Sequence, residues 1–527
     1  MVGIPIYQRN TIDDFLRRVI RRWRGREAMR FEDRVWTFDA LDQAVSNVAE
    51  ALEARGLKKA DRIGAYGRNS DAYVLLWLAC ARAGYIHVPM NFGLKGRELS
   101  YILQQSGARA IFTDPDTVAE VDGAGDMPQD LIRGAFDDPA SDFNIVDIAL
   151  NGKADPARIW PVDDFDHCQI IYTSGTTGLP KGGTMTHRAL NFAYFSGMHD
   201  CDYGHEDVVL SALPLYHAGQ LHTFFMPQLL AGARQIILRG PEPARVFELV
   251  ERHGVNSFFA PATVWVSLLR NPGFTRAAMG TLRKVYYGAS IMPVPIIREM
   301  RERLPGAQFY NCYGQSEVGP LATVLRPEDH DARPASAGRP VLGVESRIVD
   351  GQMQDVAPGV VGEIIHRSPQ LIDNYWGRED ATTEAFAGDW FHSGDLGYVD
   401  EEGYLFVVDR IKDVINTGGV LVASREVEDV LFTHPAVHEV AVIGLPDDKW
   451  LEIVVAVIIL RTGCQADAEE LIAHARRDLA YYKVPKKIIF VSQFPKNASG
   501  KILKRVLRQE HGGTAAAFIS EASPTPL

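Results

Sequence analysis

Short apolar runs alternate with helix-like segments from residue 60 onward. In the first stretch, apolar spacing predicts strands at 62–66, 85–89 and 110–113, and helices at 72–83 and 96–105. Strands that alternate with helices are typical of a parallel sheet, because each helix returns the chain to the start of the next strand. We therefore predict a parallel α/β subdomain here.

The same alternation returns after residue 230 and predicts a second parallel sheet. The expected strands are 234–238, 257–260 and 284–287, and the expected helices are 243–253, 264–270 and 294–304.

After about residue 340 the strands become shorter and are separated by glycine turns, which predicts a small β unit. A compact α+β pattern follows. The predicted fold class is α/β, with two parallel α/β subdomains and the small β unit in one large N-terminal domain, then a small mobile α+β C-terminal domain. The expected boundaries are a large domain at 1–408, a hinge at 409–410, a small domain at 411–511 and a disordered tail at 512–527, where the pattern has no period.

An amphipathic helix is expected between residues 11 and 26, where apolar residues such as Leu16 and Val19 have helical spacing among many arginines. Two interpretations are open. The helix can dock its apolar stripe on the domain, which we favour, or it can contact an anionic membrane surface.

Composition narrows the function class. The formal net charge is −12, opposite in sign to the basic surface that nucleic-acid binding needs, so no nucleic-acid partner is expected. The 5 cysteines are scattered and form no Cys-x-x-Cys pair, which favours a reducing cytoplasm. No apolar run reaches the ~20 residues that span a bilayer, so no transmembrane segment is expected.

The densest chemical signal is the run Tyr-Thr-Ser-Gly-Thr-Thr-Gly-Leu-Pro-Lys-Gly at 172–182, directly after an apolar strand. Small residues let the backbone wrap an anion, hydroxyls donate hydrogen bonds, and Lys181 adds positive charge. The run departs from the Walker A pattern, because Pro180 and Gly182 stand where that pattern has Gly and Ser or Thr. It therefore predicts a phosphate cradle of another kind.

This loop resembles the phosphate-binding signature of the adenylate-forming superfamily, which includes acyl-CoA synthetases, luciferases and peptide-synthetase adenylation domains. Further motifs of that superfamily follow in order: Tyr-Gly-Gln-Ser-Glu at 313–317, with Ser where Thr is usual, Ser-Gly-Asp at 393–395, Asp-Arg at 409–410 and Pro-Lys-Asn-Ala-Ser-Gly-Lys at 495–501. The resemblance covers nearly the whole chain. The wording of its motifs is most similar to the fatty-acyl-CoA synthetases.

The resemblance implies an activity and a set of site residues. It implies that ATP and a carboxylic acid form acyl-AMP, with Lys501 as catalytic lysine, Glu317 and Thr176 as Mg²⁺ ligands, and Glu317 counted among the catalytic residues. The implied ATP contacts are Thr173, Ser174, Gly175, Thr176, Thr177, Gly178, Lys181, Gly288, Ala289, Ser290, Asn311, Cys312, Tyr313, Gly314, Gln315, Ser316, Asp395 and Arg410.

The acyl side of the site is implied by the motif Leu-Pro-Leu-Tyr-His ending at His217, whose imidazole would gate the carboxylate pocket as a catalytic residue. A zinc site at His217 and His222 is not expected, because no carboxylate or thiol stands at ligand spacing. The residues that would line the acyl pocket are His217, Val264, Trp265, Gly288 and Ala289.

The motifs say less about which molecule accepts the acyl group. The resemblance implies domain rotation about Asp409 and an acceptor tunnel beside Gly418 and Gly419, but Val420 and Leu421 replace the polar pair often found in CoA ligases. We favour CoA as acceptor and an acid that is fatty or otherwise apolar. The alternatives are an amide synthetase that uses an amine and a non-catalytic nucleotide-binding protein. No carrier segment follows Lys501, and we expect a cytoplasmic monomer or homodimer.

Overall fold

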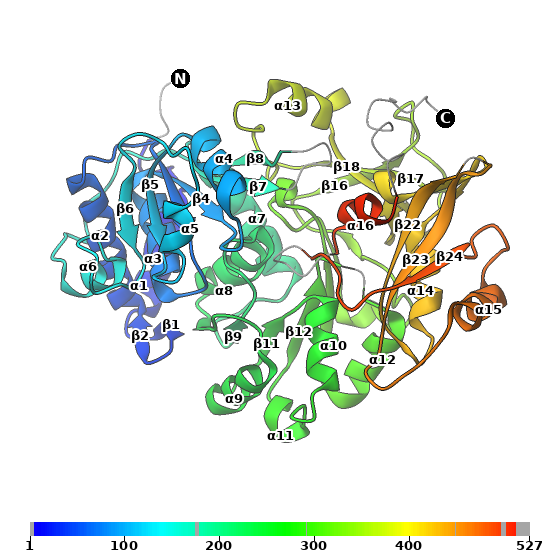
Figure 1. Cartoon of the computed structure of the whole chain (residues 1–527). Helices are drawn as coiled ribbons and strands as arrows, with labels where there is room; N and C mark the ends of the chain where they lie inside the picture. The colour runs from blue at the N-terminus through cyan, green and yellow to red at the C-terminus, as the bar shows by residue number, and fades with distance from the viewer. Residues whose placement is uncertain (1–4, 174–178, 291, 448, 497–501, 513–527) are drawn as a thin grey trace. The chain divides into compact units, whose positions relative to one another are not determined.

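In the computed structural model of the protein, the described residues are 5–173, 179–290, 292–447, 449–496 and 502–512. The chain divides into two compact units, each with its own sheets (Figure 1). Unit 1 comprises residues 1–345 and 366–391, and unit 2 comprises residues 346–365 and 392–527.

Unit 1 contains a six-stranded sheet in the order β6-β5-β3-β4-β7-β8, parallel except that β8 returns antiparallel to β7. Helices α2, α3 and α6 pack together on one face, while α4 and α5 lie on the other (Figure 1). The strands are β3 (Arg62–Tyr66), β4 (Ile86–Met90), β5 (Ala108–Thr113), β6 (Ile132–Ala135), β7 (His167–Thr173) and β8 (Lys181–Thr186).

A nine-stranded sheet completes unit 1 in the order β15-β14-β13-β12-β11-β9-β10-β1-β2. The pairs from β13 to β1 are parallel, so their carboxyl ends share one edge of the sheet, where open α/β sheets place their ligands. The strands are β1 (Glu27–Phe31), β2 (Arg34–Thr37), β9 (Val208–Ser211), β10 (Arg234–Ile237), β11 (Ser257–Phe259), β12 (Lys284–Gly288), β13 (Gln308–Tyr313), β14 (Thr323–Leu325) and β15 (Arg339–Pro340).

The described part of unit 1 contains α-helices, short 3₁₀ turns and the π-helix η1. They are α1 (Ile12–Trp23), α2 (Phe38–Ala54), α3 (Asp71–Ala83), α4 (Gly96–Ser106), α5 (Val118–Asp122), α6 (Ile145–Asn151), α7 (His187–Asp200), η1 (Gly219–Phe225), α8 (Met226–Leu230), α9 (Pro243–His253), α10 (Ala262–Arg270), α11 (Arg276–Met279), α12 (Val294–Arg303) and α13 (Glu379–Ala385), with short 3₁₀ turns η2 (Ser316–Val318), η3 (Pro327–Asp329) and η4 (Ala387–Asp389).

The N-terminal helix α1 packs its apolar stripe into the core of unit 1. Leu16 and Val19 are buried there. The fully buried guanidinium of Arg82 on α3 holds the helix through Asp13, at 2.7 Å, and also pairs with Asp42. A buried cation is tolerated only when it is paired, so these carboxylates fix α1 in place. The docking interpretation of this helix agrees with the structure.

Unit 2 holds two sheets. The first has the order β16-β17-β18-β19, and the second has the order β21-β20-β23-β22, with β24 also paired to β23. The elements are β16 (Glu345–Val349), β17 (Gly362–Arg367), β18 (Phe391–Val399), β19 (Leu405–Arg410), η5 (Ile411–Asp413), β20 (Ile415–Thr417), β21 (Val420–Val422), α14 (Ser424–Phe432), β22 (Val437–Asp447), β23 (Leu451–Leu460), α15 (Ala468–Asp478), β24 (Lys487–Phe490) and α16 (Lys504–His511).

The α/β class with parallel sheets in the N-terminal part is confirmed. The expected strand at 62–66 and the expected helix at 243–253 have the same bounds in the structure. The boundary at 409–410 stays a prediction and lies within unit 2, since the sheet formed by β16 to β19 is grouped mainly with the C-terminal residues. Residues 513–527 of the predicted disordered tail lie outside the described residues.

Candidate active site

The glycine-rich loop connects two antiparallel strands. β7 ends at Thr173, β8 begins at Lys181, and these two residues are paired in the register. The predicted phosphate contacts from Ser174 to Gly178 lie outside the described residues. Sequence periodicity did not reveal β8, because Gly182 and Gly183 carry no side chains to show alternation. The base of the loop is thus fixed by a β-hairpin.

Residues 372–376, also in unit 1, pack closely on β8. The backbone N–H of Trp376 donates to the Gly182 carbonyl at 2.7 Å, and the Thr184 N–H donates to the Asn374 carbonyl at 2.9 Å. A Cβ on Gly183 would lie only 3.0 Å from Cγ2 of Ile372. Glycine at 183 therefore allows this segment to approach the hairpin, and this approach brings Tyr375 to the loop.

Glu317 is the best-defined acidic group of the site. Its Oε1 accepts hydrogen bonds from Oγ1 of Thr173 at 3.0 Å and from the Tyr375 hydroxyl at 3.1 Å. Its backbone carbonyl accepts from the Ile372 N–H at 2.9 Å. Three segments distant in the sequence therefore fix this carboxylate at the base of the glycine-rich loop.

Tyr375 is a site residue that the sequence analysis missed. Burial and the negative charge of Glu317 raise the pKa of its phenol well above the ordinary value. The hydroxyl therefore remains a donor to Glu317 at neutral pH. An aromatic pair before a glycine, at 375–377 in a polar loop, is the only sequence signal that could have suggested this residue.

Lys181 lies on the same hairpin. Its side chain is 15% exposed, and its Nζ is 4.0 Å from Oε2 of Glu384. The same Nζ is 5.5 Å from the centre of the Tyr375 ring. The ion pair is long and the Glu384 side chain is 83% exposed, so Lys181 can exchange this partner for a phosphate oxygen at little cost.

The predicted adenine segment lies at the carboxyl ends of β12 and β13, where Gly288 is paired with Cys312. A Cβ on Gly288 would lie 2.1 Å from the Cys312 carbonyl oxygen, so only glycine fits. Ala289 has a φ of 61° and is exposed, as is Ser290. The two strands end in a close-packed backbone with exposed small residues beyond it.

The residues after β13 form a tight turn. A Cβ on Gly314 would lie 2.1 Å from the Pro320 carbonyl, and Gln315 and Ser316 lead into η2 and Glu317. The Tyr313 ring is half-buried, 6.3 Å from the ring of His366. The Asn311 amide donates to the Ser336 carbonyl at 2.8 Å, which already uses one of its two N–H groups. The adenine roles of these residues stay predictions.

The acyl-side residues are placed on two elements. His217 is half-buried just before η1, and its Nδ1 accepts from the Gly219 N–H at 3.2 Å. On α10, Val264 is half-buried, whereas Trp265 is fully buried and donates its indole N–H to the Tyr286 carbonyl at 3.2 Å. Trp265 therefore has no exposed surface of its own in this structure, and its place in the lining of the acyl pocket stays a prediction.

The remaining predicted residues are in unit 2. Asp395 and Arg410 are cross-strand partners on β18 and β19, with Oδ1 and Nε 3.0 Å apart. Gly418 and Gly419 have φ angles of 64° and 86° in the turn between β20 and β21. Lys501 lies outside the described residues.

Asp409 caps a helix. Its Oδ2 accepts from the backbone N–H of Ser424 at 2.6 Å and from the Ser424 hydroxyl at 2.7 Å, at the first residue of α14. Its Oδ1 accepts from the N–H of Arg410 at 2.8 Å. The carboxylate satisfies N-terminal donors of α14, which the sequence did not indicate.

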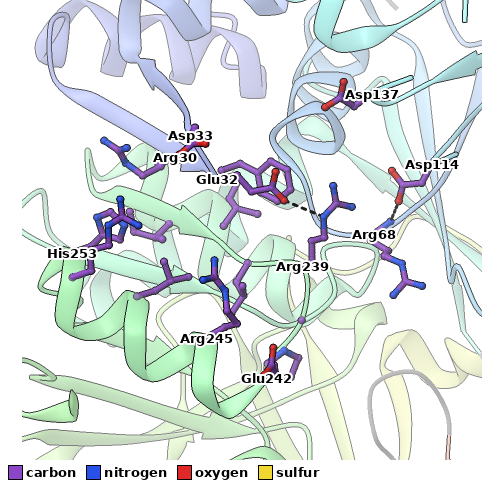
Figure 2. Close-up of a pocket in the computed structure, with 18 of the residues that line it drawn as sticks. Arg30, Glu32, Asp33, Arg68, Asp114, Asp137, Arg239, Glu242, Arg245 and His253 are labelled. Carbon is purple, nitrogen blue, oxygen red and sulfur yellow. Dashed lines mark hydrogen bonds and ion pairs between the residues drawn. The ribbon is translucent and has the colours of Figure 1, made fainter. Parts of the chain in front are cut away.

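A cavity of about 1160 Å³ opens elsewhere in unit 1, along the carboxyl ends of β1 and β10. Figure 2 shows Arg68 and Arg239 near each other, with Asp114 and Glu32 as their respective partners. None of the predicted site residues lines this cavity. Acidic and basic side chains alternate along the cavity wall, so the cavity has no continuous positive surface that would bind a phosphate.

Comparison with known proteins identifies the family of this chain. The sequence profile of the family "AMP-binding enzyme" matches residues 16–376, and that of "AMP-binding enzyme C-terminal domain" matches residues 426–501. A feruloyl-CoA synthase from Amycolatopsis sp. is 34% identical over 485 residues, which are 92% of this chain and 96% of that protein.

Two solved structures are also similar. The anthranilate CoA ligase AuaEII, in complex with anthranoyl-AMP, has a TM-score of 0.90 and 25% identity and covers 97% of this chain and 99% of its own. The amide bond synthetase McbA from Marinactinospora thermotolerans has a TM-score of 0.84 and 26% identity, over 95% and 100% of the two chains. The resemblance drawn from the motifs is confirmed. The chain belongs to the family of AMP-binding enzymes, adenylate-forming ligases that activate an acid with ATP.

Proposed function

We propose that this protein is an acid–thiol ligase, which converts a fatty or other apolar carboxylic acid, ATP and CoA into acyl-CoA, AMP and pyrophosphate. The observation that carries the proposal is the carboxylate of Glu317, held by Thr173 and Tyr375 at the base of the glycine-rich loop beside Lys181. The feruloyl-CoA synthase and the anthranilate CoA ligase support CoA as acceptor.

In the first half-reaction a carboxylate oxygen of the acid attacks the α-phosphorus of ATP, and the bond to the pyrophosphate oxygen breaks. The reacting phosphates are anionic, so positive charge must be fixed in place before the reaction. Lys181 would bind phosphate oxygens from the hairpin, and Lys501 would neutralise the charge at the α-phosphate. The half-buried His217 would border the acid's carboxylate and shield it from water.

The oxygen atoms of Glu317 suit Mg²⁺, which prefers hard oxygen ligands and is usually held by one or two carboxylates together with substrate phosphates. No group of three or more His, Cys, Asp or Glu side chains suited to a metal occurs within the described ranges. Glu317 and Thr176 would hold the ion together with the phosphates of ATP, since carboxylate and hydroxyl oxygens are hard ligands. When bound, the ion would neutralise charge on those phosphates.

The motifs imply the residues that would contact the nucleoside. Asp395 would accept hydrogen bonds from the ribose hydroxyls, with Arg410 at 3.0 Å orienting its carboxylate. Tyr313 would stack on the adenine, and Asn311 would donate its second N–H to the edge of the base. Gly288, Ala289 and Ser290 would border both the adenine and the acyl group.

In the second half-reaction the CoA thiolate attacks the acyl carbon and AMP leaves, after the small domain (411–511) rotates about Asp409. The Gly418–Gly419 turn would admit the pantetheine arm. Val420 and Leu421 are 44% and 51% exposed, so they are not buried packing residues of this turn. An apolar surface beside the turn is compatible with a pantetheine arm and also with an amine acceptor.

The amide synthetase is the second candidate, favoured by the likeness to McbA and by these two apolar side chains. The test is incubation with Mg-ATP and a panel of fatty and aromatic acids, with CoA in one arm and amines in another, and mass spectrometry of the products. We expect CoA-dependent thioester. Amide above the uncatalysed background with little thioester would establish the amide synthetase instead.

We also propose a cytoplasmic location. The free thiols support it, since Cys80, Cys168, Cys201 and Cys312 are buried and Cys464 is exposed. Among the described residues, no helix is both long enough and apolar enough to cross a membrane.

The hinge role of Asp409 can be separated from its capping role. Asp409→Ala removes the hydrogen bonds to Ser424 but leaves φ unrestricted, so we expect near-normal transfer from supplied acyl-AMP. Asp409→Pro fixes φ near −65° and removes the cap, and we expect transfer to slow about tenfold or more. Rapid-quench measurement of each half-reaction checks both. Equal transfer rates in the two variants would contradict a hinge at this residue.

A further inference from the structure

A chain of buried polar side chains crosses unit 1 away from the reacting atoms. The Tyr194 hydroxyl on α7 lies 2.8 Å from Nδ1 of His222, and Nε2 of His222 lies 2.7 Å from Oε1 of Gln169 on β7. Nε2 of Gln169 lies 3.0 Å from Nδ1 of His87 on β4. All four side chains are at most 1% exposed.

The placement of the Gln169 amide sets the direction of the hydrogen bonds along this row of side chains. Gln169 donates from its amide nitrogen and accepts at its oxygen, so His222 must carry its proton on Nε2 and His87 must accept at Nδ1. His222 then accepts from Tyr194 at Nδ1. Burial lowers the pKa of both histidines to about 3, so both rings are neutral at physiological pH. The last N–H, on Nε2 of His87, has no acceptor among the described residues.

This row of hydrogen bonds joins two parts of the proposed site. Gln169 lies four residues before Thr173 on the strand that leads into the glycine-rich loop. His222 lies on the π-helix η1, five residues after His217. π-Helices are rare and are frequently found at functional sites. The Trp77 ring packs against both histidines, and its centroid lies 5.4 Å from the centroid of each imidazole.

The π-helix is also tied to the other sheet. Gln220 donates to the hydroxyl of Ser211 on β9 at 3.2 Å, and that hydroxyl donates to Gln235 on β10 at 3.1 Å. Side chains on η1 therefore bond to both sheets of unit 1. An apolar core could pack the same space without hydrogen bonds, but it would not fix η1 at one position along β7, because hydrogen bonds are directional and apolar contacts are not.

We propose that His222 and Gln169 are positioning residues, which set the distance between the His217 segment and the base of the phosphate-binding hairpin. Neither residue touches a reacting atom. The proposal rests on the proposed function for its kinetic consequence, because a shift of about 1 Å between the acid and the α-phosphate can lower the rate about 100-fold.

The test compares three variants in ATP–pyrophosphate exchange. His222→Phe keeps a ring and removes both hydrogen bonds, and we expect kcat to fall about 10-fold to 100-fold with a smaller change in KM for ATP. His222→Gln retains a donor for Gln169 and should recover part of the loss. Ser257→Ala is the matched control. It removes a buried 2.8 Å hydrogen bond to Gln228 in the same unit, and we expect kcat within about twofold of wild type.

Kinetics of His222→Phe within twofold of wild type, or an equal loss of kcat in Ser257→Ala at similar melting temperatures, would overturn the proposal. Should His222→Phe not fold, Tyr194→Phe removes only the first bond of the chain and takes its place. Nitrogen NMR of histidine-labelled wild-type protein is independent of any substrate: Nε2-protonated neutral rings at 87 and 222 are expected, and Nδ1 protonation at either overturns the direction of the chain. Absence of exchange in wild type with every acid would instead count against the proposed function.

Discussion

Replacing Lys501 by alanine is expected to lower the rate of acyl-AMP formation by about 100-fold to 1000-fold, the usual cost of removing one fixed group that stabilises a transition-state charge. Transfer from supplied acyl-AMP to CoA should be spared, because the small domain that carries Lys501 is proposed to rotate about Asp409 before CoA attacks. Single-turnover measurement of each half-reaction checks both rates.

The matched control for this lysine is Lys496→Ala. Lys496 lies in the same motif, but its Nζ pairs with Glu439 at 2.6 Å within unit 2. Ion pairs near the surface contribute about 0–1 kcal/mol, so this variant should keep both half-reactions. Equal losses of adenylation and transfer in Lys501→Ala would mean that the lysine supports the fold or both steps, and its proposed role would fail.

Glu317→Gln is expected to lower adenylation by about 100-fold and to raise the Mg²⁺ concentration needed for half-maximal rate. Glutamine keeps an oxygen that accepts from Thr173 and Tyr375, so the hydrogen bonds at 3.0 and 3.1 Å can persist while the negative charge is lost. The effect therefore measures charge rather than geometry. Titration of the exchange rate with Mg²⁺ provides the measurement.

Two further variants separate the causes of this effect. Tyr375→Phe removes one hydrogen bond to Glu317 but keeps its charge, and we expect a loss of about tenfold or less. Glu384→Gln removes the charge that lies 4.0 Å from Lys181 on a side chain that is 83% exposed, and we expect a rate close to wild type. A Glu317→Gln enzyme with unchanged Mg²⁺ dependence would show that the metal is held elsewhere.

The amino-acid sequence by itself determined the strand at 62–66, the helix at 243–253 and the order of the motifs from the glycine-rich loop to Lys501. These features are local. The spacing of apolar residues within one segment predicts its helix or strand. The residues of one motif likewise lie within about ten positions of one another. The family and its acid-activating chemistry therefore followed from the chain alone.

Only the tertiary structure decided which polar residues lie together at the candidate site. Tyr375 donates to a carboxylate that is 58 positions away in the chain. Nothing in the sequence indicated that Gln169 pairs with His222, yet both side chains are buried and bonded to each other across 53 positions. A buried polar group needs a partner, and no sequence period encodes a partner that comes from another element, because that pairing exists only after the sheets and helices have packed.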